Sequence, residues 1–422
     1  MTVKTSLVAA AAAVCLIAGS AAADPIADFY KGKRVKLIVG ASSGGGYGTY
    51  ARMVAAYLGK YLPGNPRIIT QFMQGAASIR AANYIYNVAP QDGSVLGAVQ
   101  RAIPFLPLYG KRGPQYDPLK FNYIGSINNE VSICVSWHTT GIKTIQDAMK
   151  KELIIGGAGA NDTENFPAVL NTILGTKFKI ITGYTGVGIN LAMERGEVFG
   201  RCGWSWTSFK NQKGQWLRDK KVNILIQLSL RKLPEIGDVP LVTELATSKE
   251  DRQVFELVFA PQVMGRPYLM GPGVPKARVK AMRAAFARTT QDPDLVKKLG
   301  KAQMDVALVS GGEIQRIVAQ AYKTPKEIVD RARDSMVYKG KRIKAKITYV
   351  KHTGTITKVI RVGRKLQMKL ANGKTVKTSI SGRRTKVTIG GKKAKRKKIK
   401  VGMTCTFNYP GSGQRSKSVD CK

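Results

Sequence analysis

The chain has 422 residues and a formal net charge of +43, from 69 Lys and Arg against 26 Asp and Glu, and it contains only 2 His. A hydrophobic fraction of 44% is enough to bury sizeable cores, so this length predicts two or three folded domains and excludes a disordered basic tail. Two His and no Cys-x-x-Cys pair supply too few ligands for a typical metal site, so we expect no metal and no other cofactor.

The positive charge is concentrated at one end of the chain. Residues 341–422 hold 25 Lys and Arg and a single acid, Asp420, which gives +24, whereas residues 1–340 carry +19. Near Tyr338-Lys339-Gly340-Lys341 a helix-like pattern gives way to alternating Thr, Val, Ile and Lys. We therefore expect a separate basic, β-rich domain over residues 339–422.

The N-terminal segment has the pattern of an export signal. Lys4 precedes an apolar run over residues 7–19, and Ala21-Ala22-Ala23 forms a small-residue cleavage site before Asp24. The alternative is a membrane anchor, but this run is too short to cross roughly 30 Å of hydrocarbon. The sequence thus predicts a signal peptide over residues 1–23, cleaved near Ala23-Asp24.

Four cysteines remain after cleavage, an even number in a chain bound for an oxidising compartment. Cys134 and Cys202 lie in the main body, and Cys405 and Cys421 lie in the basic domain. We expect these two pairs to form disulfides; the alternative is four buried free thiols.

The main body alternates short apolar runs with amphipathic stretches. Residues 35–39 predict a buried strand, which a glycine loop joins to a helix over residues 49–61. A strand at 67–70, a helix over 76–87 and a strand at 94–99 follow. Further strands are expected at 132–136, 153–155, 179–181, 198–202 and 222–227. This alternation predicts an α/β fold with largely parallel sheets, which place ligands at the carboxyl ends of their strands.

The glycine loop is the most informative local feature. Gly40-Ala41-Ser42-Ser43-Gly44-Gly45-Gly46-Tyr47-Gly48-Thr49 stands between a strand and a helix. Glycines let the backbone approach a ligand closely, and a helix start presents free N–H groups to an anion. A nucleotide loop is less consistent, because both the G-x-x-x-x-G-K-[ST] pattern and the third glycine of G-x-G-x-x-G are missing. The loop predicts anion or carboxylate binding, with an ordinary glycine turn as the alternative.

The same loop also matches the nucleophile elbow of serine hydrolases, since Gly40-Ala41-Ser42-Ser43-Gly44 fits G-x-S-x-G. The acid and base would have to be Asp92 or Asp117 with His138 or His352. The hydrolase fold needs strands before the elbow, however, and here the elbow follows the first strand. A secreted serine hydrolase is therefore the alternative function, and we expect a binding protein with no catalytic residues.

Several motifs follow one another along the main body. The early ones are Phe29-Tyr30-Lys31-Gly32-Lys33, Gln74-Gly75-Ala76-Ala77-Ser78 and Ala89-Pro90-Gln91-Asp92-Gly93. The later ones are Gly156-Gly157-Ala158-Gly159-Ala160-Asn161-Asp162-Thr163, Gly183-Tyr184-Thr185-Gly186 and Pro272-Gly273-Val274-Pro275. In this order, over about residues 29–335, they resemble the receptor component of tripartite tricarboxylate transporters, the Bug-type extracytoplasmic solute-binding proteins.

The resemblance implies a periplasmic, two-lobed Venus-flytrap fold, with residues 24–104 and 228–338 in one lobe and 105–227 in the other. It also implies a small organic carboxylate as ligand and the permease subunits of a tripartite transporter as membrane partners. The ligand-binding positions that it implies are Ser43, Gly45, Gly46, Tyr47, Thr49, Gly159, Asn161, Asp162, Tyr184, Thr185 and Gly186. Gly48 stands where many relatives have an Asp that could pair with a ligand amine, which favours a plain carboxylate over an amino acid.

The basic domain lies outside this resemblance. Period-two alternation predicts strands at 344–351, 354–361, 365–370, 374–380, 385–389 and 403–409, with a hairpin turn at Ala371-Asn372-Gly373. We expect a small closed or partly closed antiparallel barrel stapled by Cys405 and Cys421. A basic run in a loop would bind polyanions: Lys392, Lys393, Lys395, Arg396, Lys397 and Lys398.

Export decides which polyanion this run would meet. It argues against nucleic acid and favours anionic envelope polymers or lipid headgroups, which would tether the receptor near its transporter. The alternatives are a solvated loop and, for the whole chain, a polyanion-binding envelope protein.

Overall fold

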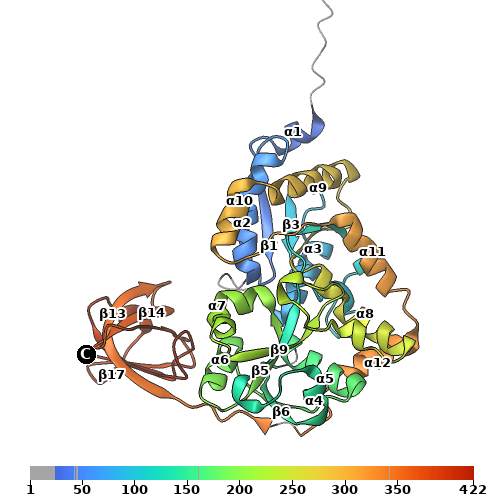
Figure 1. Cartoon of the computed structure of the whole chain (residues 1–422). Coiled ribbons are helices and arrows are strands. Elements are labelled where there is room, and N and C mark those ends of the chain that lie inside the picture. The colour runs from blue at the N-terminus through green and yellow to red at the C-terminus, as the bar shows by residue number, and fades with distance from the viewer. Residues whose placement is uncertain (1–23, 42, 44–45, 160, 342) are drawn as a thin grey trace, which may run out of the picture.

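The computed structural model describes residues 24–41, 43, 46–159, 161–341 and 343–422. Two α/β lobes form the main body, and a separate β domain follows at the C-terminus (Figure 1). The expected signal peptide, residues 1–23, lies outside the described residues. No helix in these ranges is both long and apolar enough to cross a membrane.

The first lobe contains a six-stranded sheet in the order β11-β4-β10-β3-β1-β2. Its parallel strands are β1 (Arg34–Val39), β2 (Arg67–Phe72) and β3 (Val95–Ala98). Its antiparallel strands are β10 (Pro267–Met270), β4 (Asn122–Ser126) and β11 (Val309–Ser310). The helices are α1 (Pro25–Tyr30), α2 (Gly46–Tyr61), α3 (Ile79–Asn87), α9 (Lys276–Thr290), α10 (Pro293–Lys301) and α11 (Gly311–Ala321).

Both faces of the central strand β1 are buried. Leu37 and Val39 share a core with apolar residues of α2 and α9, whereas Ile38 packs with residues of α3 on the other face. A parallel strand that is covered on both sides must be apolar on both sides. This explains the nearly continuous apolar run in its sequence.

The second lobe contains a six-stranded sheet in the order β12-β7-β6-β8-β5-β9. Its strands are β5 (Ser132–Trp137), β6 (Leu153–Gly156), β7 (Phe178–Thr182), β8 (Gly200–Ser205), β9 (Val222–Leu228) and β12 (Ile343–Lys344). Its helices are α4 (Ile145–Lys150), α5 (Asp162–Leu174), α6 (Gly186–Glu194) and α7 (Trp206–Arg218). The expected strands of both lobes are present with small shifts at their ends.

Two boundaries differ from the expectation. β4 lies in the first sheet, between β10 and β11, so the chain enters the second lobe only after it and not at residue 105. Conversely, α8 (Lys249–Val263) and α12 (Lys326–Ser335) reach α5 of the second lobe, where the rings of Phe166 and Phe259 lie 4.9 Å apart. An apolar run identifies a strand or helix, but not the sheet that it joins.

The C-terminal domain is a single seven-stranded sheet in the order β15-β14-β13-β18-β19-β16-β17. Its strands are β13 (Val350–Ile360), β14 (Lys365–Leu370), β15 (Thr375–Ser379), β16 (Lys386–Ile389), β17 (Lys392–Lys393), β18 (Thr404–Tyr409) and β19 (Ser418–Cys421). The pairings are antiparallel except for β16 with β19. The end of β15 returns to the segment before β19, where Ser379 N donates to Gln414 O at 3.1 Å, so the barrel is partly closed.

Two details of this domain differ from the sequence prediction. The strand expected at 344–351 is divided, because β12 joins the second lobe while β13 starts only at Val350. The basic run is not a loop: Lys392 and Lys393 form β17, and residues 396–398 form a 3-10 turn.

Both expected cysteine pairs lie at disulfide distance. Cys134 on β5 and Cys202 on the adjacent β8 have Cα atoms 3.9 Å apart. Cys405 and Cys421 face each other across β18 and β19, with Cα atoms 4.0 Å apart. The second pair joins the last strand of the chain to the centre of the sheet.

Candidate ligand-binding site

The carboxyl ends of the parallel strands in the first lobe are held together by one buried serine. Ser78 Oγ donates a hydrogen bond to Gly40 O at 2.9 Å, after β1, and accepts one from Gln100 N at 3.1 Å, after β3. A Cβ on Gly40 would lie 2.5 Å from this oxygen, so the glycine is needed for the close approach. Ser78 thus fixes the glycine loop relative to the segment that follows β3.

The turn that carries Ser78 has an unusual backbone. Ala76, Ala77 and Ser78 have φ values of 43°, 51° and 78°, in the left-handed region that side chains rarely adopt. The helix expected over 76–87 therefore begins only at Ile79. Strained backbone of this kind occurs where surrounding contacts determine it, often at functional sites. No pattern in the sequence distinguishes this turn from a helix start.

Arg101 links the loops of the two lobes. Its backbone N–H donates to Tyr47 Oη at 3.1 Å, next to the start of α2, and its Nη2 forms an ion pair with Asp162, the first residue of α5. The side chain of Arg101 is 11% exposed and that of Asp162 is 40% exposed. Burial alone would lower the pKa of Arg101, but the carboxylate of Asp162 raises it, so the guanidinium remains charged. Sequence reasoning missed this arginine because it follows an apolar strand without a recognisable motif.

A second group of contacts joins the lobes beside α7. Thr207 Oγ1 donates to Asp305 Oδ2 at 2.9 Å, and Lys210 Nζ lies 3.4 Å from Asp305 Oδ1. The backbone oxygen of Asp305 accepts a hydrogen bond from Tyr50 Oη of α2 at 2.7 Å. The first and second lobes are thus bridged at two places.

A buried ion pair lies beneath the start of α2. Arg266 Nη2 lies 3.2 Å from Glu130 Oε2, with side chains that are 7% and 1% exposed. The guanidinium carbon lies 4.4 Å from the ring centroid of Tyr47, and a Cβ on Gly46 would lie 3.4 Å from Nη2. Glu130 balances the charge of Arg266, so the attraction of this helix start for an anion comes from its own free N–H groups.

In the second lobe, the loops after β6 and β7 lie side by side. Tyr184 N donates to Gly157 O at 3.1 Å, and Glu164 accepts hydrogen bonds from both Gly159 N, at 2.7 Å, and Thr182 Oγ1. Gly159 has a φ of 95°, which suits glycine. The carboxylate of Glu164 therefore already accepts the hydrogen bond of Gly159 N–H, one of the amides expected to bind a ligand.

The implied ligand-binding residues of the first lobe are only partly brought together. Tyr47 lies beside Arg101, and Gly46 lies against Arg266. Thr49 Oγ1 accepts a hydrogen bond from Arg52 at 3.2 Å. Ser43 Oγ accepts one from Arg361 of the C-terminal domain at 2.6 Å, and Gly45 lies outside the described residues.

In the second lobe the implied residues have several internal partners. Asn161 caps α5, with its Oδ1 accepting from Thr163 N at 2.9 Å, and Asp162 pairs with Arg101. Tyr184 is buried and donates to Glu197 at 3.3 Å; burial raises the pKa of its hydroxyl to about 12. Thr185 and Gly186 lie at the start of α6, beneath the C-terminal domain.

The residues named for a hydrolase triad make separate contacts. Asp92 accepts from Ser94 N at 2.9 Å, Asp117 from Leu119 N at 2.9 Å, and His352 contacts Tyr409 Oη at 3.0 Å in the C-terminal domain. His138 lies beside the ring of Trp137. None of these contacts joins an acid to a histidine, and Ser42 lies outside the described residues.

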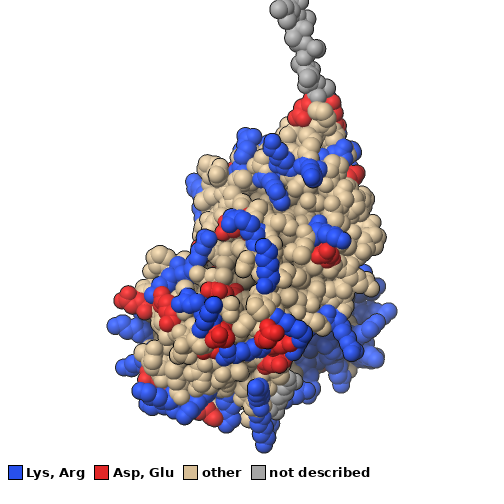
Figure 2. Space-filling model, turned by 90° about the vertical axis from the view of Figure 1, so that its right-hand side faces the viewer, with Lys and Arg blue, Asp and Glu red and all other residues tan. Residues whose placement is uncertain are grey.

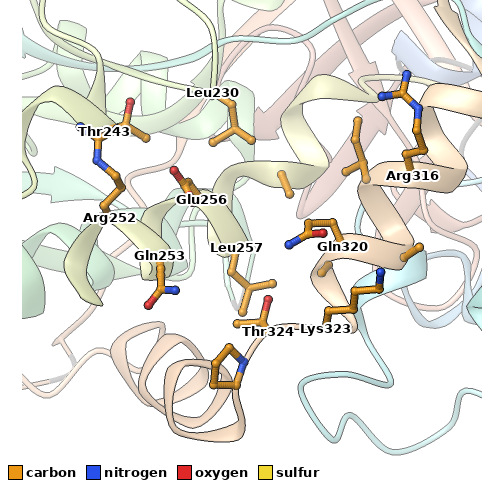
Figure 3. Close-up of a pocket in the computed structure, with 15 residues that line it drawn as sticks. Leu230, Thr243, Arg252, Gln253, Glu256, Leu257, Arg316, Gln320, Lys323 and Thr324 are labelled. Atoms are coloured by element: carbon orange, nitrogen blue, oxygen red, sulfur yellow. The ribbon is translucent and has the colours of Figure 1, made fainter. Parts of the chain in front are cut away.

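A large cavity of about 890 Å³ lies away from these loops, between α8 and α11 (Figure 3). Arg252, Glu256, Arg316 and Lys323 line it together with apolar residues. On the face that carries α8, α11 and α12, Lys and Arg are interspersed with Asp and Glu and form no single patch (Figure 2).

No family model matches the sequence, and no curated protein matches it. Solved structures do match. A TctC solute-binding protein from Polaromonas superposes with a TM-score of 0.56 and 18% identity, covering 72% of this chain and 99% of its own. The periplasmic binding protein BugD superposes with a TM-score of 0.54 and 16% identity, covering 75% of this chain and 100% of its own. An R. palustris protein with adipate superposes with a TM-score of 0.53 and 16% identity, covering 72% of this chain and 97% of its own.

The main body therefore has the two-lobed fold of periplasmic solute-binding proteins. The TctC and BugD neighbours are solute-binding proteins, which are not enzymes. They match up to three quarters of this chain, while nearly their whole length is covered. The two-lobed α/β fold expected from the sequence is thus confirmed.

Proposed function

We propose that the protein is a periplasmic receptor that captures a small organic carboxylate between its lobes. The observation that carries this proposal is the pairing of Arg101 with Asp162, which joins the ligand loops of the two lobes across their facing strand ends. The structural neighbours supply the fold, and one of them holds adipate, a dicarboxylate.

The contacts within the site suggest how binding would proceed. The free N–H groups at the start of α2 form the positive end of that helix in the first lobe. Arg101 stands between this helix start and Asp162, so a ligand carboxylate would compete with an internal carboxylate for the same guanidinium. Binding then shifts the balance between open and closed lobes, because the ligand gains contacts to both only in the closed state.

Delivery to the permease subunits of a tripartite tricarboxylate transporter completes the proposed role. Closure of the lobes would create the surface that these membrane proteins recognise. The basic run of the C-terminal domain supports a tether to anionic envelope polymers or lipid headgroups, because Lys392, Lys393, Lys395, Lys397 and Lys398 are exposed. Arg396 is less available, because its backbone and side chain lie against Gly363 and Gly382.

Thermal-shift screening of the mature protein against adipate, succinate, benzoate and amino acids tests the proposal. A carboxylate at about 100 times its Kd stabilises a protein by about 2.7 kcal/mol, which is a measurable rise in Tm. The diol analogue of adipate, 1,6-hexanediol, is the matched control and should produce no shift. If no carboxylate raises the Tm above this control, the proposed function is wrong.

A further inference from the structure

The C-terminal domain covers the start of α6 in the second lobe. Thr185 Oγ1 donates to Gln414 Oε1 at 2.6 Å, and Arg195 Nη2 donates to Pro410 O at 2.5 Å. A cavity of about 400 Å³ lies along this seam, with Thr185, Gly186, Arg201 and Gln212 on one side and Ser379, Gln414 and Arg415 on the other. Its walls therefore come from two separately folded parts of the chain.

Arg201 is the most unusual residue of this cavity. It is 7% exposed, and burial lowers the pKa of its guanidinium to about 9. Its Nη1 donates to Gly186 O at 2.8 Å and to Asn190 Oδ1 at 2.7 Å, while its buried Nε has no partner among the described residues. Arg101 and Arg266, the other buried arginines discussed above, each pair with an acid, and in the described part of the chain Arg201 pairs with none.

The neutral side chains of the cavity are oriented as hydrogen-bond donors. Gln212 Oε1 accepts from Asn190 Nδ2 at 3.2 Å, and Gln414 Oε1 accepts from Thr185 Oγ1. Because both amide oxygens are occupied, each glutamine has its –NH₂ group left to donate. The start of α6 adds its positive end, and a Cβ on Gly186 would lie 3.3 Å from Arg201 Nη2, so glycine lets the helix start lie close to the guanidinium. The guanidinium carbon also lies 4.1 Å from the ring centroid of Trp204, which is a neutral partner and no counter-ion.

The charge balance of the cavity indicates the ligand. Arg201 and Arg415 both line it, and none of its described lining residues is acidic. A buried guanidinium without a counter-ion is unfavourable, and an oxyanion held by charged and amide donors would compensate it.

We propose that this seam is an oxyanion site that requires both the second lobe and the C-terminal domain. Its ligand is a carboxylate or inorganic phosphate, which share the oxygen geometry that a guanidinium recognises. The carboxylate case rests on the proposed function, since Thr185 and Gly186 belong to the proposed ligand set. The phosphate case does not depend on it.

Calorimetric titration of the full mature protein with phosphate and, separately, with adipate tests the site. Arg415 is exposed, so Arg415→Ala should fold normally and should weaken oxyanion binding about tenfold, the effect of losing one charge-assisted hydrogen bond. Arg383→Ala is the matched control, because it removes the same charge from an exposed position of the same domain outside the cavity. Arg201→Gln should abolish the binding that depends on Arg415, with Tm measured to confirm folding.

The outcomes separate this site from the function proposed above. Adipate binding that is unchanged in Arg415→Ala, without phosphate binding, overturns the seam site while the receptor function stands. Phosphate binding that depends on Arg415, without any carboxylate binding, supports the seam site while the receptor function falls. Equal effects of Arg415→Ala and Arg383→Ala, or no oxyanion binding at all, overturn the seam site.

Discussion

The ion pair between Arg101 and Asp162 should stabilise the bridged arrangement of the lobes. Exposed ion pairs contribute about 0.2–1 kcal/mol, and breaking a fully buried pair costs about 3–5 kcal/mol. Arg101 is almost buried and Asp162 is 40% exposed, so we expect a coupling energy of about 1–2 kcal/mol. This corresponds to a factor of roughly 5–30 in the equilibrium between bridged and separated lobes.

A double-mutant cycle with Arg101→Gln, Asp162→Asn and the double variant measures this coupling from urea unfolding. Small-angle scattering of the ligand-free Asp162→Asn protein should give a larger radius of gyration than the unaltered protein. The surface pair of Lys298 and Asp294, with side chains 55% and 57% exposed, is the control and should couple by less than about 0.5 kcal/mol. The reasoning is refuted if the coupling energy of Arg101 and Asp162 is no larger than that of the control pair and the radius of gyration is unchanged.

Three other predictions concern the first lobe and the basic domain. Ser78→Ala leaves Gly40 O and Gln100 N without their buried partner and should lower the free energy of unfolding by about 1–3 kcal/mol; a loss below about 0.5 kcal/mol in urea would contradict this. Asp292 has its pKa lowered by hydrogen bonds from Tyr61, Lys60 and the start of α10, so its contribution to stability is present above about pH 4 and is lost as the pH falls further. The Tm difference between the unaltered protein and Asp292→Asn should therefore shrink from pH 7 to pH 2; a constant difference argues against it. Replacing four exposed lysines of the basic run by Gln should reduce heparin retention and the salt dependence of that retention. The same change at four exposed lysines of the main body is the control and should have a much smaller effect. Equal effects of the two sets would exclude a local polyanion site. The two sets are Lys392, Lys393, Lys397 and Lys398, and Lys276, Lys280, Lys297 and Lys301.

The sequence predicts most strands because their patterns are local. The apolar run of β1 and the alternation of β14 and β15 follow directly from burial on two faces or on one. Sheet membership is not local. β4 joins the first sheet and β12 the second through partners far away in the chain, and nothing in their own residues encodes this.

The candidate site shows the same limit. The glycine loop and the loops after β6 and β7 are recognisable from composition, and the structure places them at the ends of parallel strands. Arg101 and Arg201 are not, and Ser78 stands in a recognised motif that does not reveal its contacts, because these roles depend on residues from other elements. Single charged residues in or next to apolar strands occur throughout the chain, so no sequence rule would have selected the two arginines.

The C-terminal domain contacts the ligand loops of both lobes, through Arg361 to Ser43 and through Gln414 to Thr185. Movement of one lobe relative to the other must therefore break or shift at least one of these contacts. By linkage, whatever strengthens both contacts stabilises the arrangement of the lobes in which they form, and that arrangement stabilises both contacts equally. The strands of the domain, residues 350–422, hold 21 Lys and Arg against one acid, so the domain carries +20 next to these loops. This charge raises the local concentration of anions within about a Debye length, roughly 8 Å at physiological salt. Under the proposed function, this uneven charge would favour capture of an anionic ligand as well as attachment to a polyanion.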